Sequence, residues 1–376
     1  MRLRIRSLAV AARKRGLTRN HATEPRAQAS GFSDEMLAKS VLALLACLAG
    51  AHLAAAAALT CSACHARQTA TFPGNAMSHA LETVAQCDIL RANPSLAVKK
   101  DSYSYKIERQ GDRSLYTVSD SHEALSIPLA WAFGIDRGGQ TYVFEKGGTF
   151  YESRVSYYKD LKGLDWTMGA TDSPPANLIE AAGRKIGPAE ETLCFGCHAT
   201  HAVSQGHMTF DTLVPGVLCV RCHAGAEAHM DSFSKPGAKP IAMKKLGQLT
   251  TEETSNFCGQ CHRTWEQIAR DGPRNIGNLR FQPYRLTKSK CYDTDDQRIS
   301  CVACHDPHKP LDQVVAHYDS KCQACHNSRN ASAKLCKVGT KDCVSCHMPK
   351  IELPGSHHLF TDHMIRIARA GEAYPE

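Results

Sequence analysis

Residues 301–349 read CVACHDPHKPLDQVVAHYDSKCQACHNSRNASAKLCKVGTKDCVSCHMP. Three C-x-x-C-H motifs begin 21 residues apart in this stretch, at Cys301, Cys322 and Cys343. The units between the motifs share little other similarity, and units this short cannot each bury a core of their own. The stretch therefore predicts short helices and long loops wrapped around cofactors.

The same motif occurs seven times and uses 14 of the 18 cysteines. Two thiols at this spacing can form thioethers with the two vinyl groups of one haem, while the adjacent histidine reaches the iron from the same side. A zinc site or a redox disulfide needs the C-x-x-C pair but no histidine directly behind it. We therefore expect seven covalent haems c. The motif residues are Cys61, Cys64, His65; Cys194, Cys197, His198; Cys219, Cys222, His223; Cys258, Cys261, His262; Cys301, Cys304, His305; Cys322, Cys325, His326; and Cys343, Cys346, His347.

The composition is typical of a chain that packs around large apolar cofactors. Apolar residues make up 43 % of the 376 residues, but aromatic residues only 7 %. The protein core is therefore thin for this length unless haem helps to fill it. Seven haems in such a chain must pack against one another, and closely packed haems exchange electrons.

The formal net charge of +8 does not indicate a nucleic-acid partner. Residues 1–58 hold nine Lys or Arg against three Asp or Glu, so most of the positive excess lies there. Two propionates on each haem would make the remainder acidic, and the sequence has no basic patch with interleaved aromatic residues. We therefore expect no binding of DNA or RNA.

The weakly apolar run at residues 41–59, which follows Lys39, indicates a signal peptide. Its natural start would be Met36, which leaves residues 1–35 as a long basic leader or as an over-predicted start. An uncleaved anchor and a lipoprotein modified at Cys47 are the alternatives. The run predicts an exported, periplasmic protein that is membrane-anchored if the signal stays uncleaved.

Histidines outside the motifs are numerous enough to give every iron a second ligand. Bis-histidine ligation keeps haem potentials low and closes the iron, whereas a methionine ligand would raise the potential, and we expect the nearby methionines to be packing residues. His201 and His308 each follow a motif histidine by three residues and should cap a neighbouring haem. His122 and His207 are not included, and His122 is expected to face solvent. The distal candidates are His79, His201, His229, His308, His317, His357, His358 and His363.

Three further cysteines lie outside the motifs and beyond the leader. Cys291 and Cys336 flank motifs of the last third and could form a disulfide in an oxidising compartment. Cys87 then has no obvious partner, and we expect it to be a buried free thiol.

The stretch between Cys87 and Cys194 contains no cysteine and alternates in strand fashion, as in residues 102–109 and 150–158. It predicts a small antiparallel sheet, and residues 361–369 predict a final helix. The expected organisation is a leader and signal peptide (1–58), a first haem segment (59–98), a β-rich insertion (99–172), a six-haem region (173–350) and a C-terminal ligand segment with its helix (351–376).

Several short segments resemble those of a known family. Residues 77–80 read MSHA after the first motif, residues 301–308 read CVACHDPH, residues 222–229 read CHAGAEAH, and residues 343–363 join a C-H-M-P segment to a T-D-H segment. In these segments the chain resembles the cytochrome c-554 family, which is related to hydroxylamine oxidoreductase and the pentahaem nitrite reductase. Ala224 and Ala226 depart from the family's C-H-G-P-G-x-x-H.

The resemblance covers about 59–95 and 190–370. It implies a mainly α fold with long loops, a haem core with parallel and perpendicular haem pairs, and a small antiparallel β insertion similar to one found in some relatives.

We favour an electron carrier without catalytic residues. The alternative is an oxidoreductase for a small nitrogen or sulfur compound, of the nitrite or hydroxylamine type, at one open haem. Nitrite reductases of that group commonly carry C-x-x-C-K, which this chain lacks, but hydroxylamine oxidoreductases cross-link a C-x-x-C-H haem to tyrosine, and Tyr284, Tyr292 or Tyr318 could serve. The expected partners are redox proteins, with a membrane partner or further copies stacked through their haems as a third hypothesis.

Overall fold

The computed structural model describes residues 60–135, 138–170, 173–235, 237–327 and 335–376. Residues 59–376 form one compact unit. The predicted signal peptide, its start at Met36, and the lipoprotein and anchor alternatives lie outside the described residues.

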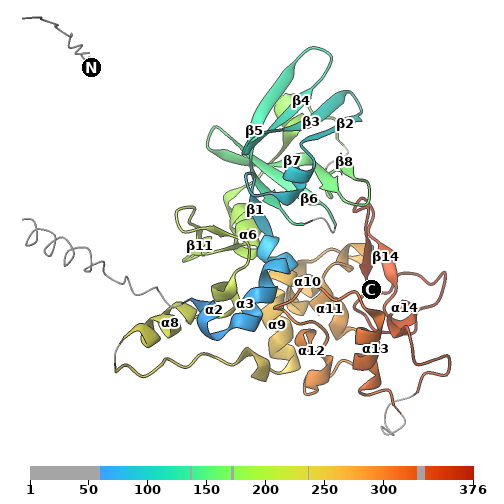
Figure 1. The fold of residues 1–376 in the computed structure, drawn as a ribbon. Helices are drawn as coiled ribbons and strands as arrows, with labels where there is room; N and C mark the ends of the chain where they lie inside the picture. The colour runs from blue at the N-terminus through green and yellow to red at the C-terminus, as the bar shows by residue number, and fades with distance from the viewer. Residues whose placement is uncertain (1–59, 136–137, 171–172, 236, 328–334) are drawn as a thin grey trace, which may run out of the picture. The chain divides into compact units, whose positions relative to one another are not determined.

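A large antiparallel sheet dominates the first half of this unit (Figure 1). Its nine strands follow the order β2-β3-β4-β5-β6-β7-β8, with β1 paired to β5 and β9 paired to β7. The sheet curls so that its first and last strands in this order, β2 and β8, approach each other. The strands are β1 (Leu81–Thr83), β2 (Ser95–Lys100), β3 (Tyr103–Gln110), β4 (Arg113–Ser119), β5 (Ala124–Phe133), β6 (Gln140–Lys146), β7 (Thr149–Tyr158), β8 (Gly163–Trp166) and β9 (Gly183–Lys185).

Alternating apolar residues build the core of this sheet. Tyr105 and Ile107 of β3 pair in register with Val118 and Tyr116 of β4, and all four are at most 1 % exposed. Because strand side chains alternate between the two faces, these four share one buried face. Cys87 is buried in the same core and donates to Gln140 Oε1 at 3.1 Å, so the prediction of a buried free thiol is confirmed.

The predicted mainly α fold with a small β insertion is wrong. The sheet has nine strands and extends from Leu81 to Lys185, so strand is a major component of the fold. Local patterns concealed several strands. β2 ends in Lys99 and Lys100, and β5 contains Pro128 and a register shift after Leu129, which are features that weaken a strand signal.

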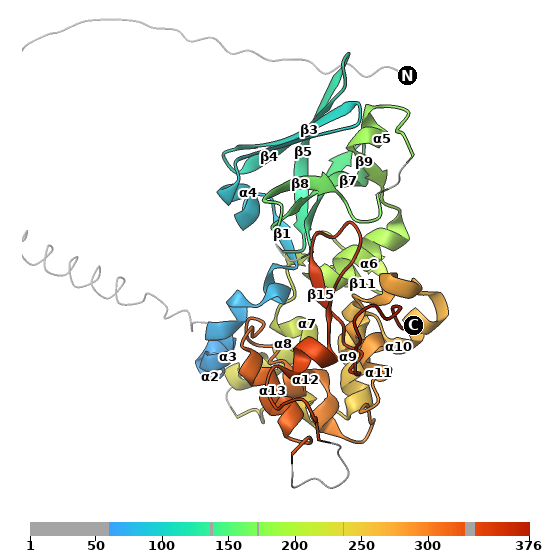
Figure 2. The same cartoon turned by 90° about the vertical axis from the view of Figure 1, so that its right-hand side faces the viewer.

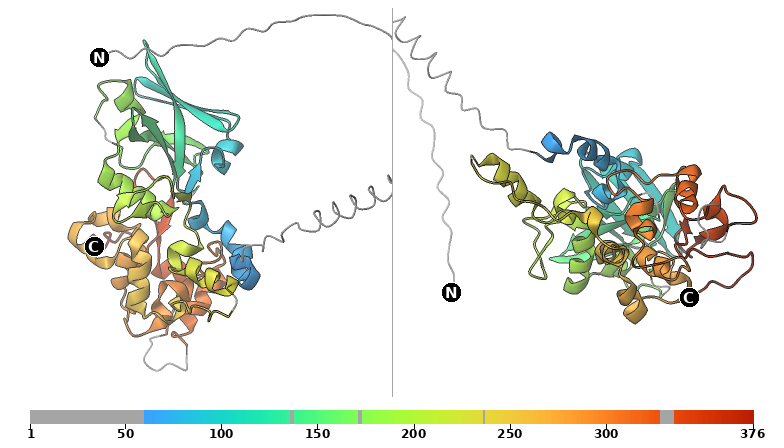
Figure 3. Two further views of the ribbon diagram at one scale, coloured as in Figure 1. Left: turned by 90° about the vertical axis from the view of Figure 1, so that its left-hand side faces the viewer. Right: turned by 90° about the horizontal axis from the view of Figure 1, so that it is seen from below.

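The second half consists of short helices and small hairpins, as Figure 2 and the yellow-to-red part of Figure 3 show. Across all the described residues, the helices are α2 (Cys61–Cys64), α3 (Ala66–Thr71), α4 (Asp88–Ala92), α5 (Leu178–Ala182), α6 (Pro188–His198), α7 (Cys219–Cys222), α8 (Ala226–Ser234), α9 (Thr251–His262), α10 (Trp265–Asp271), α11 (Gln282–Thr287), α12 (Cys301–Cys304), α13 (Val315–Gln323) and α14 (Cys343–His347). The 3-10 helices are η1 (Phe72–Gly74), η2 (Ala76–His79), η3 (Leu246–Gln248), η4 (Asn275–Asn278) and η5 (Gln297–Ile299). The small hairpins pair β10 (Ala199–Thr200) with β13 (Val214–Pro215), β11 (Val203–Ser204) with β12 (His207–Met208), and β14 (Lys350–Glu352) with β15 (Leu359–Thr361).

The predicted C-terminal helix over residues 361–369 is also wrong. Thr361 ends strand β15, and the chain then turns at Asp362, whose carboxylate accepts from the Met364 N–H and from buried Arg285. A side chain that bonds its own backbone two residues on favours a turn over a helix.

Candidate haem-binding region

Each C-x-x-C-H motif described by the structure begins in a helix. Motifs one, three, five and seven coincide with α2, α7, α12 and α14, while motifs two and four end α6 and α9, and motif six begins in α13. Residues three apart lie on the same side of a helix. The two thiols of a motif therefore project together, as attachment to one porphyrin requires.

None of the seventeen cysteines in the described part of the chain forms a disulfide. The predicted disulfide between Cys291 and Cys336 is therefore wrong. Cys336 is exposed, whereas Cys291 is half-buried near Cys322 and Cys325 of motif six. The motif thiols remain available for thioether bonds.

Several motifs lie side by side, some of them successive in the sequence and some not. The thiols of Cys197 and Cys261 are within hydrogen-bonding reach, which joins motif two to motif four. Cys258 and Cys301 make the corresponding contact between motifs four and five. Further contacts join motifs one and three, through Cys61 and Cys219, and motifs six and seven, through Cys322 and Cys343.

Backbone carbonyls orient two of the motif histidines. His198 Nδ1 lies 2.8 Å from the Ala80 carbonyl, and His347 Nδ1 lies 2.8 Å from the Arg366 carbonyl. Since a carbonyl only accepts, Nδ1 must carry the proton, and Nε2 keeps the lone pair that binds a metal. His305 Nδ1 is buried and has no hydrogen-bond partner among the described residues.

Two motif histidines lie beside distal candidates, at a distance between ring centroids that fits one iron between them. The ring centroids of His223 and His308 are 6.0 Å apart, and those of His305 and His363 are 6.2 Å apart. If iron bonds imidazole at about 2.0 Å, as zinc does, and the ring centroid lies about 1.1 Å behind the nitrogen, two axial imidazoles have centroids about 6 Å apart. These residues fit a haem with two histidine ligands.

Burial favours the neutral form of His223, His305 and His363, which is the form that ligates metal. Desolvation lowers the pKa of His223 and of His305 below its ordinary value. It lowers the pKa of His363 to about 4, and the neighbouring His305 lowers it further in the same direction.

The remaining distal candidates have other contacts. His229 Nδ1 donates to the Ile241 carbonyl at 2.6 Å, which leaves its Nε2 for a metal. His201 Nε2 lies 3.1 Å from Glu227, and His317 Nε2 lies 3.3 Å from the Cys304 carbonyl. His79 contacts Glu82 through Nδ1 and the Pro73 carbonyl through Nε2. As distal ligands, these four residues remain predictions.

His357 and His358 lie against the large sheet. His357 Nε2 is 3.0 Å from Asp165 Oδ2, and its ring packs on Tyr158 with centroids 4.8 Å apart. His358 Nδ1 is 3.4 Å from Asp160 Oδ2. Both histidines are thus engaged by carboxylates. His122 is exposed, as predicted.

A cavity of about 520 Å³ lies between motifs two and three. Its lining includes Leu193, Ala202, Val203 and Val220, together with Cys197 of motif two. Polar residues, among them Thr200, His201 and Arg221, complete the lining. A cavity that combines an apolar wall, a few polar groups and a motif thiol is a suitable environment for a porphyrin.

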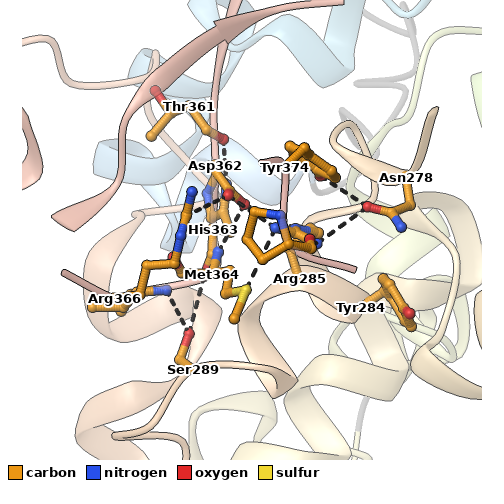
Figure 4. A network of polar contacts seen from close by, with 12 residues as sticks. Asn278, Tyr284, Arg285, Ser289, Thr361, Asp362, His363, Met364, Arg366 and Tyr374 are labelled. Atoms are coloured by element: carbon orange, nitrogen blue, oxygen red, sulfur yellow. Dashed lines mark hydrogen bonds and ion pairs between the residues drawn. The ribbon is translucent and has the colours of Figure 1, made fainter. Parts of the chain in front are cut away.

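Sequence reasoning missed a buried ion-pair network beside His363. Figure 4 shows Arg285 of α11 reaching Asp362, with Ser289, Tyr374 and Arg366 around them. The T-D-H segment was visible in the sequence. Nothing in the residues around Arg285 marked that side chain as buried.

The family model for cytochrome c554 and c-prime matches residues 170–224. This stretch contains the motifs that begin at Cys194 and Cys219, with His201 between them. The match supports a protein of the c-type cytochrome class, and with it covalently bound haem and a role in electron transfer. The match does not show the expected relation to hydroxylamine oxidoreductase. Searches of curated proteins and of solved structures give no match, and no helix in the described residues has the length and apolarity needed to span a membrane.

Proposed function

We propose that this chain is a multihaem c-type cytochrome that carries electrons through seven covalently bound haems, one at each C-x-x-C-H motif. The observation that carries the proposal is the pairing of motif histidines with distal histidines, whose ring centroids are 6.0 Å apart for His223 and His308 and 6.2 Å apart for His305 and His363. An iron with two histidine ligands has no open position for a substrate, which favours electron transfer over catalysis.

The contacts between motifs support electron transfer between neighbouring haems within three groups of motifs: one and three; two, four and five; six and seven. Bound haem supplies a reversible one-electron change between ferric and ferrous iron. The chain holds neighbouring sites together through contacts such as Cys258 with Cys301 and Cys322 with Cys343. Carbonyls at Ala80 and Arg366 fix the ring orientation of His198 and His347, and the buried histidines stay neutral ligands.

We further propose that the protein is exported to the periplasm, where c-type haem is attached, and that its partners are redox proteins. A membrane-bound partner, retention through an uncleaved signal, and assembly of several copies through stacked haems are alternatives within this proposal. Nucleic acid is not among the proposed partners.

The test uses the full chain expressed with a haem-attachment system and exported. Intact mass and the pyridine haemochrome assay give the haem count, and low-temperature electron paramagnetic resonance gives the spin state of each ferric iron. We expect seven haems and low-spin bis-histidine iron. A count below seven would refute the assignment of one haem per motif.

The same spectrum tests the alternative of an oxidoreductase. A high-spin centre that shifts on adding nitrite, hydroxylamine or cyanide would reveal an open haem and replace the carrier by the enzyme. Among the three tyrosines considered, Tyr318 has its ring 5.8 Å from that of His305, but its hydroxyl donates to the Asp312 carbonyl at 2.9 Å.

A further inference from the structure

We propose that Arg285 and Asp362 form a buried clasp that positions His363 as the second ligand of the iron held by His305. The inference rests on the proposed function, because it requires a haem at the motif that begins at Cys301. It assigns Arg285 and Asp362 as positioning residues, since neither would touch the iron.

The clasp is a two-point ion pair without solvent access. Arg285 Nε donates to Asp362 Oδ1 and Nη2 donates to Oδ2, each at 2.9 Å, and both side chains are 0 % exposed. Such a fork fixes direction as well as distance. The same carboxylate accepts from the Met364 N–H at 3.0 Å and from Arg366 Nη1 at 2.7 Å, so both of its oxygens are fully used.

Arg285 is itself immobilised from its other side. Nη1 donates to the Pro375 carbonyl at 2.7 Å and to Asn278 Oδ1 at 3.3 Å. The Tyr374 ring covers the guanidinium with its centroid 4.5 Å from Cζ, and the Tyr374 hydroxyl is 2.8 Å from Asn278 Oδ1. Figure 4 shows these groups converging on Arg285. The clasp therefore has a fixed base on helix α11.

The clasp is joined to His363 by the single peptide bond between Asp362 and His363. Asp362 directly precedes His363, and its N–H donates to the Pro349 carbonyl at 3.0 Å. On the other side, Ser289 Oγ donates to the His363 carbonyl at 3.2 Å and accepts from the Ile365 N–H at 2.8 Å. His363 Nδ1 lies 3.0 Å from the Thr361 carbonyl, which leaves Nε2 for a metal. With both flanks held, the imidazole stays 6.2 Å from that of His305.

Stability alone does not account for such a pair. Removing two charges from water costs about as much as their attraction returns, and apolar residues of similar volume often replace a buried pair without loss. Two apolar residues lack directional hydrogen bonds, so they would not hold the backbone beside His363 in one geometry. The Arg285–Asp362 pair can do this.

The test is the double variant Arg285→Met/Asp362→Leu in the full, exported, haem-loaded chain. It removes both charges together, so it leaves no uncompensated buried charge, and Arg366 keeps Glu372 at 3.0 Å. We expect an unchanged haem count and one haem per chain converted from low to high spin, restored to low spin by free imidazole. His363→Ala should give the same conversion. The control, Lys106→Met/Glu108→Leu, removes an ion pair on strand β3 of the large sheet that contacts none of the haem-ligand candidates, and should leave every haem low-spin.

The outcomes separate the clasp from the proposed function. A parent protein without haem would refute the proposed function. A parent protein with its haems and a double variant whose haems all remain low-spin would overturn the clasp. If the double variant does not accumulate, Arg285→Lys takes its place, because lysine keeps the charge but cannot form the fork. We then expect a partial high-spin population that imidazole removes, and a fully low-spin spectrum would overturn the proposal.

Discussion

Replacing Arg285 alone should be far more damaging than replacing Arg285 and Asp362 together. Arg285→Met leaves the Asp362 carboxylate 0 % exposed with only Arg366 and the Met364 N–H as partners. Breaking a buried pair by removing one partner costs about 3–5 kcal/mol. The remaining partners put this case at the lower end, about 3 kcal/mol, whereas the double variant should lie within about 1 kcal/mol of the parent.

Guanidinium unfolding followed by far-ultraviolet circular dichroism measures this difference. With a slope of about 5 kcal/mol per molar guanidinium for a chain of this size, a loss of 3 kcal/mol lowers the midpoint by about 0.6 M. We expect the single variant to unfold about 0.6 M earlier than the parent and the double variant to recover most of that loss. A single variant as stable as the parent, or a double variant less stable than the single one, would refute the reasoning about the buried charge.

Three further predictions concern other parts of the chain. His308→Ala should convert one haem to high spin, seen by electron paramagnetic resonance, because it removes the ligand facing motif three; an unchanged spectrum would exclude His308 as a ligand. Burial raises the pKa of Asp165, but the hydrogen bonds from Lys100 and the Trp166 N–H, together with the charges of Lys100 and His357, outweigh burial, so the pKa lies below its ordinary value. The ionised Asp165 contributes its full stabilisation above about pH 3.9, and this contribution is lost as the pH falls through the lowered pKa. The melting temperature of Asp165→Asn should therefore fall less than that of the parent below about pH 4, as calorimetry would show. Burial raises the pKa of Cys87 to about 11, whereas the pKa of exposed Cys336 is lowered by backbone hydrogen bonds. A maleimide at about pH 8 should therefore label Cys336 and leave Cys87 unlabelled until guanidinium is added, as peptide mass mapping would show.

The parts of the site that covalent spacing decides could be predicted from the sequence. Two thiols three residues apart need only one helical turn to face the same way. Six described motifs have both cysteines within a helix, and in the sixth motif a hydrogen-bonded turn after Gln323 takes its place. His308 follows His305 by only three residues, so it cannot easily bind the iron held by His305. The sequence therefore predicted that His308 is the second ligand of a neighbouring haem. The structure brings it to His223.

The parts that depend on contacts between distant segments could not be predicted in this way. Arg285 is buried only because Asp362, Pro375 and Asn278 reach it from other segments. A charged side chain is rarely buried unless it is paired, and the sequence around Arg285 does not reveal the pair. For the same reason, strand β1 was missed, because its partner, strand β5, lies far along the chain.

The large sheet contributes to the haem region through the hairpin that leads to His363. The loop between β14 and β15 carries His357 and His358, and these two residues contact Asp165 and Asp160 of the sheet region. Strand β15 then runs directly into Asp362 and His363. The sheet anchors one end of this ligand segment and the Arg285 clasp anchors the other. Because the segment is held at both ends, the sheet is a structural support for a proposed haem ligand rather than an independent insertion.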